Sequence, residues 1–383
     1  MRMEDIVVGE VMTKSPVTAD IGDTVSDVMA MLKRYRVREV PVLKDGLTVG
    51  LISYSSLIQR RSLSLSAKAE NIMLPVPKMD VRTPVLKAAE LLMATGVGGA
   101  PVRKRGKMVG FVSRSDLIGL IMDVEELSSR KVDEVMTKNP LHVSPDDLVR
   151  SGQIMMENLD EEALPVVKSG NLVGVIGMSE LMNVMWSSKA DRPPRSPKPP
   201  RQVFDSRSRM KIQISSVMTR TPVCVSPQDD LGTVAKKMVK NHLSTIFVTD
   251  DKKLVGVIDQ TDLLEQMIGL IEREQVFVQI SGIGFRDPDI YDSMYSIIGR
   301  GMKRMAKMET PKLFFMHVSE YDTDGLQSKC SIGARLTTAH SMYYVSASGW
   351  DLLKTTSDML ETLEGKVRTK KDKRVGNRRK RSS

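Results

Sequence analysis

The chain has 383 residues and 41% of them are apolar, a share sufficient for several packed domains. Two cysteines, four scattered histidines and the lack of any apolar run near the roughly 20 residues of a membrane span exclude a disulfide framework, a metal site with recognisable spacing and a transmembrane protein. The net charge is +10 and the first residues lack the apolar core of a signal peptide, so we expect a soluble, cytoplasmic protein.

Four copies of one sequence pattern fill residues 1–272. Each copy has a methionine near its start, as in "VGEVMTKSPVTA", and a glycine near its end, as in "LTVGLISYSSL". Between them, apolar residues at helical spacing precede two short apolar strands with a polar turn, and a final helix follows. In "SPDDL" and "SPQDDL" we expect Ser144 and Ser226 to be helix N-caps. The marker residues are Met12, Met73, Met136 and Met218, with Gly50, Gly110, Gly174 and Gly256.

These copies resemble the cystathionine-β-synthase (CBS) domain family, whose repeats pair into Bateman modules and often bind adenine nucleotides. The resemblance implies copies at residues 1–60, 61–124, 125–187 and 212–272, paired one with two and three with four. A unit this small cannot bury both faces of its sheet alone, which also favours pairing. A homodimer through the CBS modules is compatible with this organisation. The Pro- and Arg-rich segment 188–211 is predicted to be an extended linker.

A nucleotide site is predicted where the last strand of copy two meets its last helix. Ser113 would lie at the helix N-terminus, which favours an anion, and Arg114 could contact a phosphate. Asp116 could accept hydrogen bonds from a ribose diol. The alternative is a Ser-x-x-Asp capping box that only stabilises the helix. The resemblance favours a ligand, since these positions bind ribose and phosphate in the family. The adenine would contact residues that are equally ordinary core residues, namely Ala100, Pro101 and Val102.

The other copies depart from this pattern. Copy one has Ser53 and Ser56 and therefore lacks the carboxylate. Copy three has Gly177 and Glu180, and copy four has Asp259 and Asp262, which places a negative charge where a phosphate would lie. We therefore predict one good site for AMP, ADP or ATP in copy two, with Glu180 and Asp262 as altered equivalents.

A different unit begins at Gln275. One strand, a helix opened by Asp287 and Pro288, three strands and a last helix give the order β-α-β-β-β-α over residues 275–365. The fold class is thus α/β and α+β, with two CBS-pair modules before this sandwich. The order, and "YYVSASGWDLLKTTSDMLETLEGKVRTKKDKR" above all, resemble the ribosome hibernation-promoting factor family. That resemblance implies docking on small-subunit rRNA and silencing of translation. The apolar stripe of the last helix is Leu352, Leu353, Met359, Leu360 and Leu363.

Positive charge gathers at the end of the chain. Residues 366–383 hold ten Lys or Arg and one Asp, which predicts a basic helix end and a disordered tail, because such charges repel and cannot pack. Clusters of this kind hold phosphates, although a solvated surface is the alternative. Tyr343, Tyr344 and Trp350 could stack on bases, but we expect at least one tyrosine to be core. The predicted RNA-binding residues are Arg300, Lys303, Arg304, Lys307, Lys366, Arg368, Lys370, Lys371, Lys373, Arg374, Arg378, Arg379, Lys380 and Arg381.

These observations lead to one hypothesis and one rival. The hypothesis is an adenine-nucleotide-sensing, ribosome-binding protein that silences translation. The rival is a CBS-domain regulatory subunit that senses AMP or ATP for a partner enzyme or transporter, without ribosome binding. A transcription regulator is disfavoured because no helix-turn-helix or zinc motif is present. No nucleophile and base are paired in the sequence, so we predict that the protein is not an enzyme.

Overall fold

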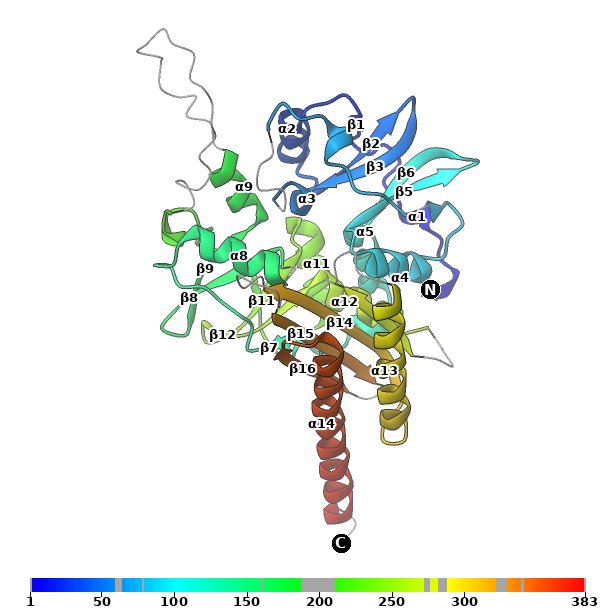
Figure 1. The fold of residues 1–383 in the computed structure, drawn as a ribbon, viewed down its shortest axis with the longest axis vertical. Helices are drawn as coiled ribbons and strands as arrows, with labels where there is room; N and C mark the ends of the chain where they lie inside the picture. Colours follow the sequence, from blue (N-terminus) through cyan, green and yellow to red (C-terminus); the bar gives the residue numbers. More distant parts are fainter. Residues whose placement is uncertain are drawn as a thin grey trace. The chain divides into compact units, whose positions relative to one another are not determined.

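The computed structural model describes residues 2–58, 64–77, 79–159, 161–186, 211–271, 276–281, 288–321, 329–338 and 341–381 (Figure 1). The chain divides into two compact units, Met1–Ile268 and Gly269–Ser383. In the described part of the chain, no helix is both long and apolar enough to span a membrane. The fold is mixed α/β, as predicted.

The first unit repeats one arrangement four times. In copies one, two and four a short strand pairs in parallel with the first strand of an antiparallel hairpin, and helices flank the hairpin. In copy three a single parallel bridge between Val143 and Val166 takes the place of this pairing. After η1 (Met3–Asp5), copy one comprises α1 (Val8–Val11), β1 (Ala19–Asp20), α2 (Val25–Tyr35), β2 (Glu39–Lys44), β3 (Leu47–Ser53) and α3 (Tyr54–Ile58). Copy two comprises η2 (Ala69–Asn71), β4 (Met79–Asp80), α4 (Val85–Thr95), β5 (Gly99–Lys104), β6 (Lys107–Ser113) and α5 (Arg114–Gly119).

The second pair of copies follows a short helical connection, η3 (Leu120–Asp123) and α6 (Glu125–Ser128). Copy three comprises α7 (Val132–Val135), β7 (Thr137–Lys138), α8 (Val149–Leu159), β8 (Ala163–Lys168), β9 (Asn171–Gly177) and α9 (Met178–Trp186). Copy four comprises η4 (Ile214–Ser216), β10 (Cys224–Val225), α11 (Leu231–Asn241), β11 (Thr245–Asp250), β12 (Lys253–Asp259) and α12 (Gln260–Ile268). The strand order β10-β11-β12-β9-β8 joins these two copies in one sheet.

The methionine and glycine that mark each copy meet across the pair rather than within a copy. A Cβ atom built on Gly110 of copy two would lie 2.6 Å from Met12 Sδ of copy one, and one on Gly50 of copy one would lie 2.5 Å from Met73 Sδ of copy two. Glycine is therefore required because the methionine of the partner copy occupies the side-chain position. The same contact joins Met136 with Gly256 and Met218 with Gly174.

Hydrogen bonds beside these contacts hold the start of each copy on its partner. Thr13 and Phe111 exchange two backbone hydrogen bonds of 2.9 Å, and Leu51 and Leu74 do the same at 2.9 and 2.8 Å. Copies one and two therefore form one module and copies three and four another, as the sequence predicted.

The hairpin turns explain the polar residues between the strands. In copy one Asp45 and Gly46 both have positive φ, 51° and 75°, which is the geometry of a two-residue turn that matches strand twist. The turns of copies two and three also end in glycine. Copy four has Asp251 and Lys252 at φ 45° and 69°, so a side chain occupies a position that favours glycine.

The prediction that Ser144 and Ser226 are N-caps is wrong. Helix α11 begins at Leu231, and its N-cap is Asp230, whose Oδ1 accepts a hydrogen bond of 2.7 Å from the Thr233 N–H. Ser226 instead forms a turn before the helix, with its N–H donating to Asp229 Oδ2 at 2.9 Å. The helix starts where the apolar periodicity starts, and aspartate caps a helix as well as serine does.

The second unit is the predicted β-α-β-β-β-α sandwich. Its elements are β13 (Phe277–Ser281), α13 (Pro288–Ala306), β14 (Pro311–Tyr321), β15 (Lys329–Thr338), β16 (Met342–Gly349) and α14 (Leu352–Arg381). The strands lie in the order β13-β14-β15-β16, with β13 and β14 parallel because α13 crosses between them. Apolar residues of α13, α14 and the sheet share one core, so both helices cover the same face.

Helices α13 and α14 run parallel to one another. Gly301 packs against Leu360, and three residues later Arg304 Nε lies 2.8 Å from Glu364 Oε2. The C-terminal ends of both helices therefore lie at the same end of the unit (Figure 1). Helix α14 continues to Arg381, where the sequence predicted a disordered tail. Lysine and arginine are good helix formers, which is consistent with a helical backbone up to Arg381.

Candidate functional site

The predicted nucleotide site of copy two is a complete capping box. Strand β6 ends at Ser113 and α5 begins at Arg114. Ser113 Oγ accepts a hydrogen bond of 3.3 Å from the Asp116 N–H, and Asp116 Oδ2 accepts from the Ser113 N–H at 2.8 Å and from the Ser113 hydroxyl at 2.7 Å. The structural alternative raised by the sequence is thus confirmed.

These bonds limit what the helix start can offer to an anion. The backbone N–H groups of Ser113 and Asp116 are taken by the capping box, and that of Arg114 donates to Gly98 O at 2.7 Å. The Ser113 hydroxyl is held by Asp116. Ser113 therefore orients the carboxylate and is not a free donor for a phosphate.

Two groups of the junction remain open. Asp116 Oδ1 accepts no hydrogen bond from any residue that the structure describes. Burial raises the pKa of the Asp116 carboxyl, although the hydrogen bonds from Ser113 oppose the shift. Arg114 Nε donates to Val97 O at 3.1 Å, and its two terminal nitrogens form no hydrogen bond within the described ranges. An acceptor and a cationic donor thus lie within three residues of each other.

Thr13 is a further candidate that the sequence argument missed. It lies opposite Phe111, two residues before Ser113, because the start of copy one docks on β6. A signal was present in the repeat, since Met-Thr recurs as Met12-Thr13, Met136-Thr137 and Met218-Thr219, with Leu74 in copy two. A threonine hydroxyl therefore accompanies the junctions of copies two, three and four, whereas Leu74 faces copy one.

The equivalent positions of the other copies are satisfied internally. Glu180 accepts from the Gly177 N–H at 2.9 Å through Oε2 and from the Thr219 hydroxyl at 3.1 Å through Oε1. Asp262 accepts from the Asp259 N–H at 2.8 Å and is only 1% exposed. Copy one uses Ser56, whose Oγ accepts from the Ser53 N–H at 3.0 Å. Copy two therefore differs from its equivalents in keeping an open acidic oxygen. Its strand residues Ala100, Pro101 and Val102 are buried, as core residues are.

A charged cluster links the copies. Arg38 of copy one pairs with Glu162 of copy three, Nη1 to Oε2, at 2.9 Å, and its Nη2 donates to the backbone O of His242 in copy four at 3.1 Å. One guanidinium thus bridges three copies. Since both modules contribute, this arginine ties one module to the other.

Glu39 connects the same cluster to the junction of copy two. Its Oε1 accepts a hydrogen bond of 2.7 Å from the Gly98 N–H. Burial raises the pKa of the Glu39 carboxyl to about 7, while this bond and the nearby positive charge of Arg114 act in the opposite direction. The charge of Arg114 therefore acts on Glu39, which lies where the copies meet.

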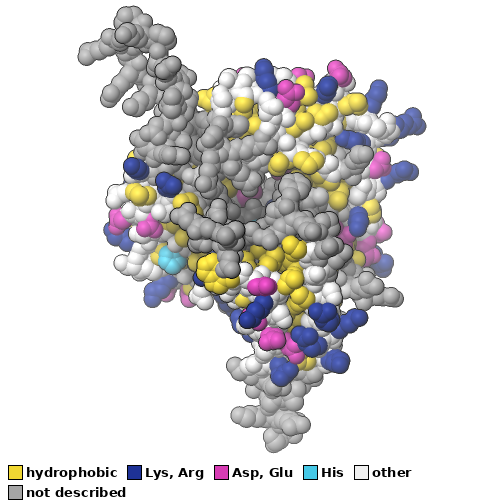
Figure 2. Space-filling model, viewed as in Figure 1, with side chains coloured by type: hydrophobic (Ala, Val, Ile, Leu, Met, Phe, Trp, Pro, Cys, Tyr) yellow, Lys and Arg dark blue, Asp and Glu magenta, His cyan; other side chains and the backbone are white. Residues whose placement is uncertain are grey.

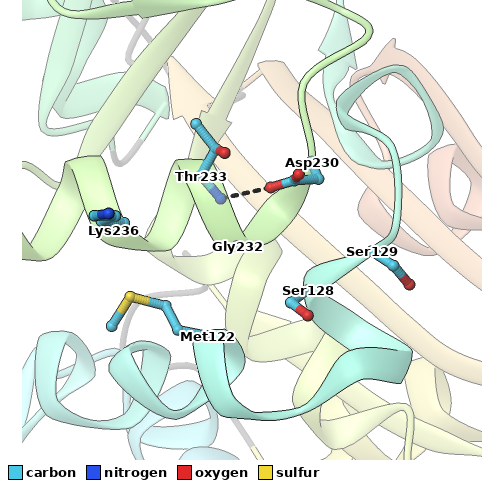
Figure 3. A pocket seen from close by; sticks show the side chains of 7 residues that line it. All are labelled: Met122, Ser128, Ser129, Asp230, Gly232, Thr233 and Lys236. Carbon is cyan, nitrogen blue, oxygen red and sulfur yellow. Dashed lines mark hydrogen bonds between the residues drawn. The ribbon is translucent and has the colours of Figure 1, made fainter.

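A separate pocket of about 530 Å³ opens at the start of α11 (Figure 3). Its lining combines polar and apolar surface, and two of its polar groups are already used: the Asp230 carboxylate caps α11 and the Ser129 hydroxyl donates to Glu125 O at 2.7 Å. None of the predicted nucleotide-binding residues lines it. The lining residues are Met122, Ser128, Ser129, Asp230, Gly232, Thr233 and Lys236. Among the residues that the structure describes, no cluster of three His, Cys, Asp or Glu could hold a metal.

The structure divides the predicted RNA-binding residues into two groups. Lys366 Nζ donates to Tyr344 O at 2.7 Å, and Lys370 Nζ lies 5.3 Å from the centre of the Tyr343 ring. Glu364 pairs with Arg304 at 2.8 Å and with Arg368 at 3.1 Å. By contrast, Arg300 and Lys303 are exposed and form no ion pair with a described residue, and Lys307 is also exposed.

Several predictions fall at the edge of the described structure. The backbone of α14 carries Lys371, Lys373, Arg374, Arg378, Arg379, Lys380 and Arg381, but their side chains lie outside the described part. The linker 188–211 lies outside it except for its last residue. Tyr343 is 7% exposed, which confirms a core tyrosine, whereas Tyr344 and Trp350 are 54% and 59% exposed.

Comparison with known proteins identifies the first unit. Four segments, residues 8–62, 69–123, 132–187 and 214–269, match the CBS domain family. These segments make up more than half of the chain. The chain therefore belongs to the CBS domain family, with four CBS domains in two pairs.

Individual relatives extend over most of the chain. An uncharacterised 33.4 kDa protein in a ribosomal RNA operon of Thermofilum pendens is 25% identical over 288 residues, 70% of this chain and 92% of that protein. The uncharacterised protein MJ1404 of Methanocaldococcus jannaschii is 23% identical over 305 residues, 78% of this chain and 70% of that protein. The crystal structure of MJ1225 from the same organism, described as a candidate archaeal homologue of g-AMPK, superposes with a TM-score of 0.60 at 20% identity, covering 68% of this chain and 99% of that one.

Proposed function

We propose that this chain is a regulatory, non-catalytic protein whose CBS domains bind an adenine nucleotide at the junction of copy two. The observation that carries the proposal is that Asp116 Oδ1 and, two residues earlier in α5, the two terminal guanidinium nitrogens of Arg114 form no hydrogen bond with a described residue. A ribose diol would donate to Asp116, a phosphate would accept from Arg114, and Thr13 would add a hydroxyl from the partner copy. AMP, ADP and ATP share this chemistry.

The site also suggests how binding is transmitted. A phosphate on Arg114 would offset the positive charge that this arginine places near Glu39, and Glu39 follows Arg38, the residue that bridges three copies. A ligand changes an equilibrium only through different affinities for its two states. The two states here would differ in the contacts of this charged cluster, and a partner protein would respond to them.

Titration calorimetry of the full chain with AMP, ADP and ATP tests the site. Asp116→Asn should weaken binding about 10- to 100-fold, because a hydrogen bond to a charged acceptor is worth about 1.5–3 kcal/mol. Glu180→Gln is the matched control, since that acid is already satisfied at the equivalent position. Equal binding by wild type and Asp116→Asn would refute the copy-two site, and loss in Glu180→Gln would move it to copy three.

A second candidate function is ribosome binding by the unit Gly269–Ser383. The observation that favours it is the parallel packing of α13 and α14, which gathers cations of both helices at one end (Figure 2). Such an end attracts RNA phosphates regardless of sequence. In this proposal the unit docks on small-subunit rRNA and silences translation, and the nucleotide changes its affinity.

Sedimentation with purified small subunits, with and without AMP or ATP, tests the second function. Wild type should pellet at low salt, and the charge reversal Arg300→Glu with Lys303→Glu should abolish pelleting. Pelleting that ignores nucleotide would leave ribosome binding without sensing. If wild type stays in the supernatant at low salt, the ribosomal function is rejected and the regulatory one stands.

A further inference from the structure

Helix α13 contains two glycines two residues apart, and only one has a packing reason. A Cβ on Gly301 would lie 3.2 Å from Leu360 Cδ1, so glycine there allows the two helices to approach closely. Among the residues that the structure describes, none has an atom within 4 Å of a Cβ on Gly299. Glycine inside a helix is less favourable than alanine by about 0.8–1.0 kcal/mol. Packing against the described residues of the unit does not explain why Gly299 is not alanine.

The neighbours of Gly299 along the helix face form an open stripe. Tyr295 lies one turn before it and Lys303 one turn after it, and residues four apart lie on the same face. Tyr295 is 46% exposed, and Lys303 is exposed with no ion pair to a described residue. Arg300, beside Gly299, is also exposed and is held along the helix by a hydrogen bond of 2.9 Å to Ser296 Oγ. Along this part of α13 the exposed ring of Tyr295 is followed by a glycine with an open Cβ position and then by two cations, Arg300 and Lys303.

We infer that this stripe is a contact site for single-stranded RNA. Phosphates lie on Arg300 and Lys303, a base stacks on the Tyr295 ring, and the strand passes close to the helix at Gly299, where a methyl group would hold it away. A single strand is required because a base inside a duplex is not free to stack on a side chain. This inference rests on the second proposed function, RNA binding.

The chemistry of the stripe favours RNA over other anionic partners. A membrane surface requires an apolar face beside the cations, and this stripe has one aromatic residue among polar ones. An acidic peptide would use the cations but gains nothing from a bare backbone at Gly299. Gly365 of α14 provides a comparison, because its Cβ position is also open but its neighbour one turn earlier is Glu361, whose charge repels phosphate.

Fluorescence anisotropy of the full chain with a short labelled RNA tests the inference. Gly299→Ala should raise the melting temperature by roughly 4 °C because alanine favours the helix. The same variant should raise the Kd for RNA about 2- to 12-fold, the range for one lost contact. The matched control is Gly365→Ala, which should gain similar stability and bind RNA as wild type does.

Variants of the side chains separate stacking from charge. Tyr295→Ala should weaken binding about tenfold while Tyr295→Phe keeps it, since a phenyl ring stacks equally well. Arg300→Ala and Lys303→Ala should each lower the salt dependence by about one phosphate contact. Polyglutamate that competes as well as RNA would overturn the inference in favour of an acidic protein.

The possible outcomes separate failure of this inference from failure of the second proposed function, RNA binding. If the two cation variants weaken binding while Gly299→Ala and Tyr295→Ala do not, charge alone holds the RNA. The stripe is then wrong as a strand site and the second proposed function survives. If wild type does not bind RNA at low salt, both fail together.

Discussion

Replacing Gly110 with alanine would test how the CBS copies are joined. The added methyl carbon would lie 2.6 Å from Met12 Sδ and 2.8 Å from Thr13 O. The methionine can turn away, but the Thr13 carbonyl is held against Phe111 by two hydrogen bonds of 2.9 Å. Relief therefore requires the start of copy one to move off copy two.

The expected cost follows from these contacts. Overpacking a tight interior contact costs about 1–3 kcal/mol, and weakening a backbone hydrogen bond costs about 0.5–1.5 kcal/mol. The free energy of unfolding should fall by about 3 kcal/mol. For a unit of this size the melting temperature should then drop by roughly 6–12 °C. A second change, Met12→Ala, should recover only part of the loss, because the Thr13 carbonyl remains.

Thermal and urea unfolding, followed by circular dichroism, measure this effect. Gly119→Ala is the control within the same unit, since its Cβ would meet only Val239 Cγ2 at 4.0 Å. That variant should be as stable as wild type or slightly more so, because alanine favours a helix. If Gly110→Ala and Gly119→Ala have the same melting temperature and free energy of unfolding, the methionine–glycine contact does not hold the module together.

Three further predictions concern other features of the first unit. Burial raises the Glu39 pKa to about 7 from its usual 4.5, so the free energy of unfolding of wild type should fall as pH rises from 5 to 8. Urea unfolding should show a decrease of at most about 3 kcal/mol between the two pH values for wild type, and no such decrease for Glu39→Gln. Lys252→Gly should raise the free energy of unfolding by about 0.5–1 kcal/mol by relieving positive φ, and Gly170→Lys should lower it; unchanged melting temperatures would contradict the turn assignment. Asp230→Ala should cost about 1 kcal/mol as a lost N-cap and Ser226→Ala much less, and a larger loss in the serine variant would restore the original prediction.

The sequence predicted the repeat well because its markers are tightly constrained. The methionines and the glycines recur in step with each other, at intervals of 61, 63 and 82 residues and of 60, 64 and 82 residues, and in each copy two antiparallel strands flank a two-residue turn. What the sequence could not show is that Met12 contacts Gly110 rather than Gly50. Both arrangements give the same spacing along the chain, and only packing in three dimensions chooses between them.

The strand–helix junction of copy two lies where the sequence placed it, and its role as a nucleotide site stays a prediction. Ser113, Arg114 and Asp116 were identified, yet their hydrogen bonds depend on local geometry that spacing leaves open. Thr13 was missed because it comes from the partner copy. In the second unit the sequence named two basic clusters separately, and it could not show that parallel helices bring them to one end or that Glu364 neutralises part of them.

The first residues of each copy dock on the partner copy, and this exchange determines where the chain can be lengthened. Residues 59–68 join α3 to η2 in the first module, and residues 187–213 join α9 to η4 in the second, a connection nearly three times as long. Closing the longer loop costs only about 1 kcal/mol more, since loop entropy grows with the logarithm of length. The contact between Met218 and Gly174 can therefore form despite the insertion. Extra residues between α9 and η4 lengthen the connection without separating copies three and four, so we expect insertions to be tolerated best at this position.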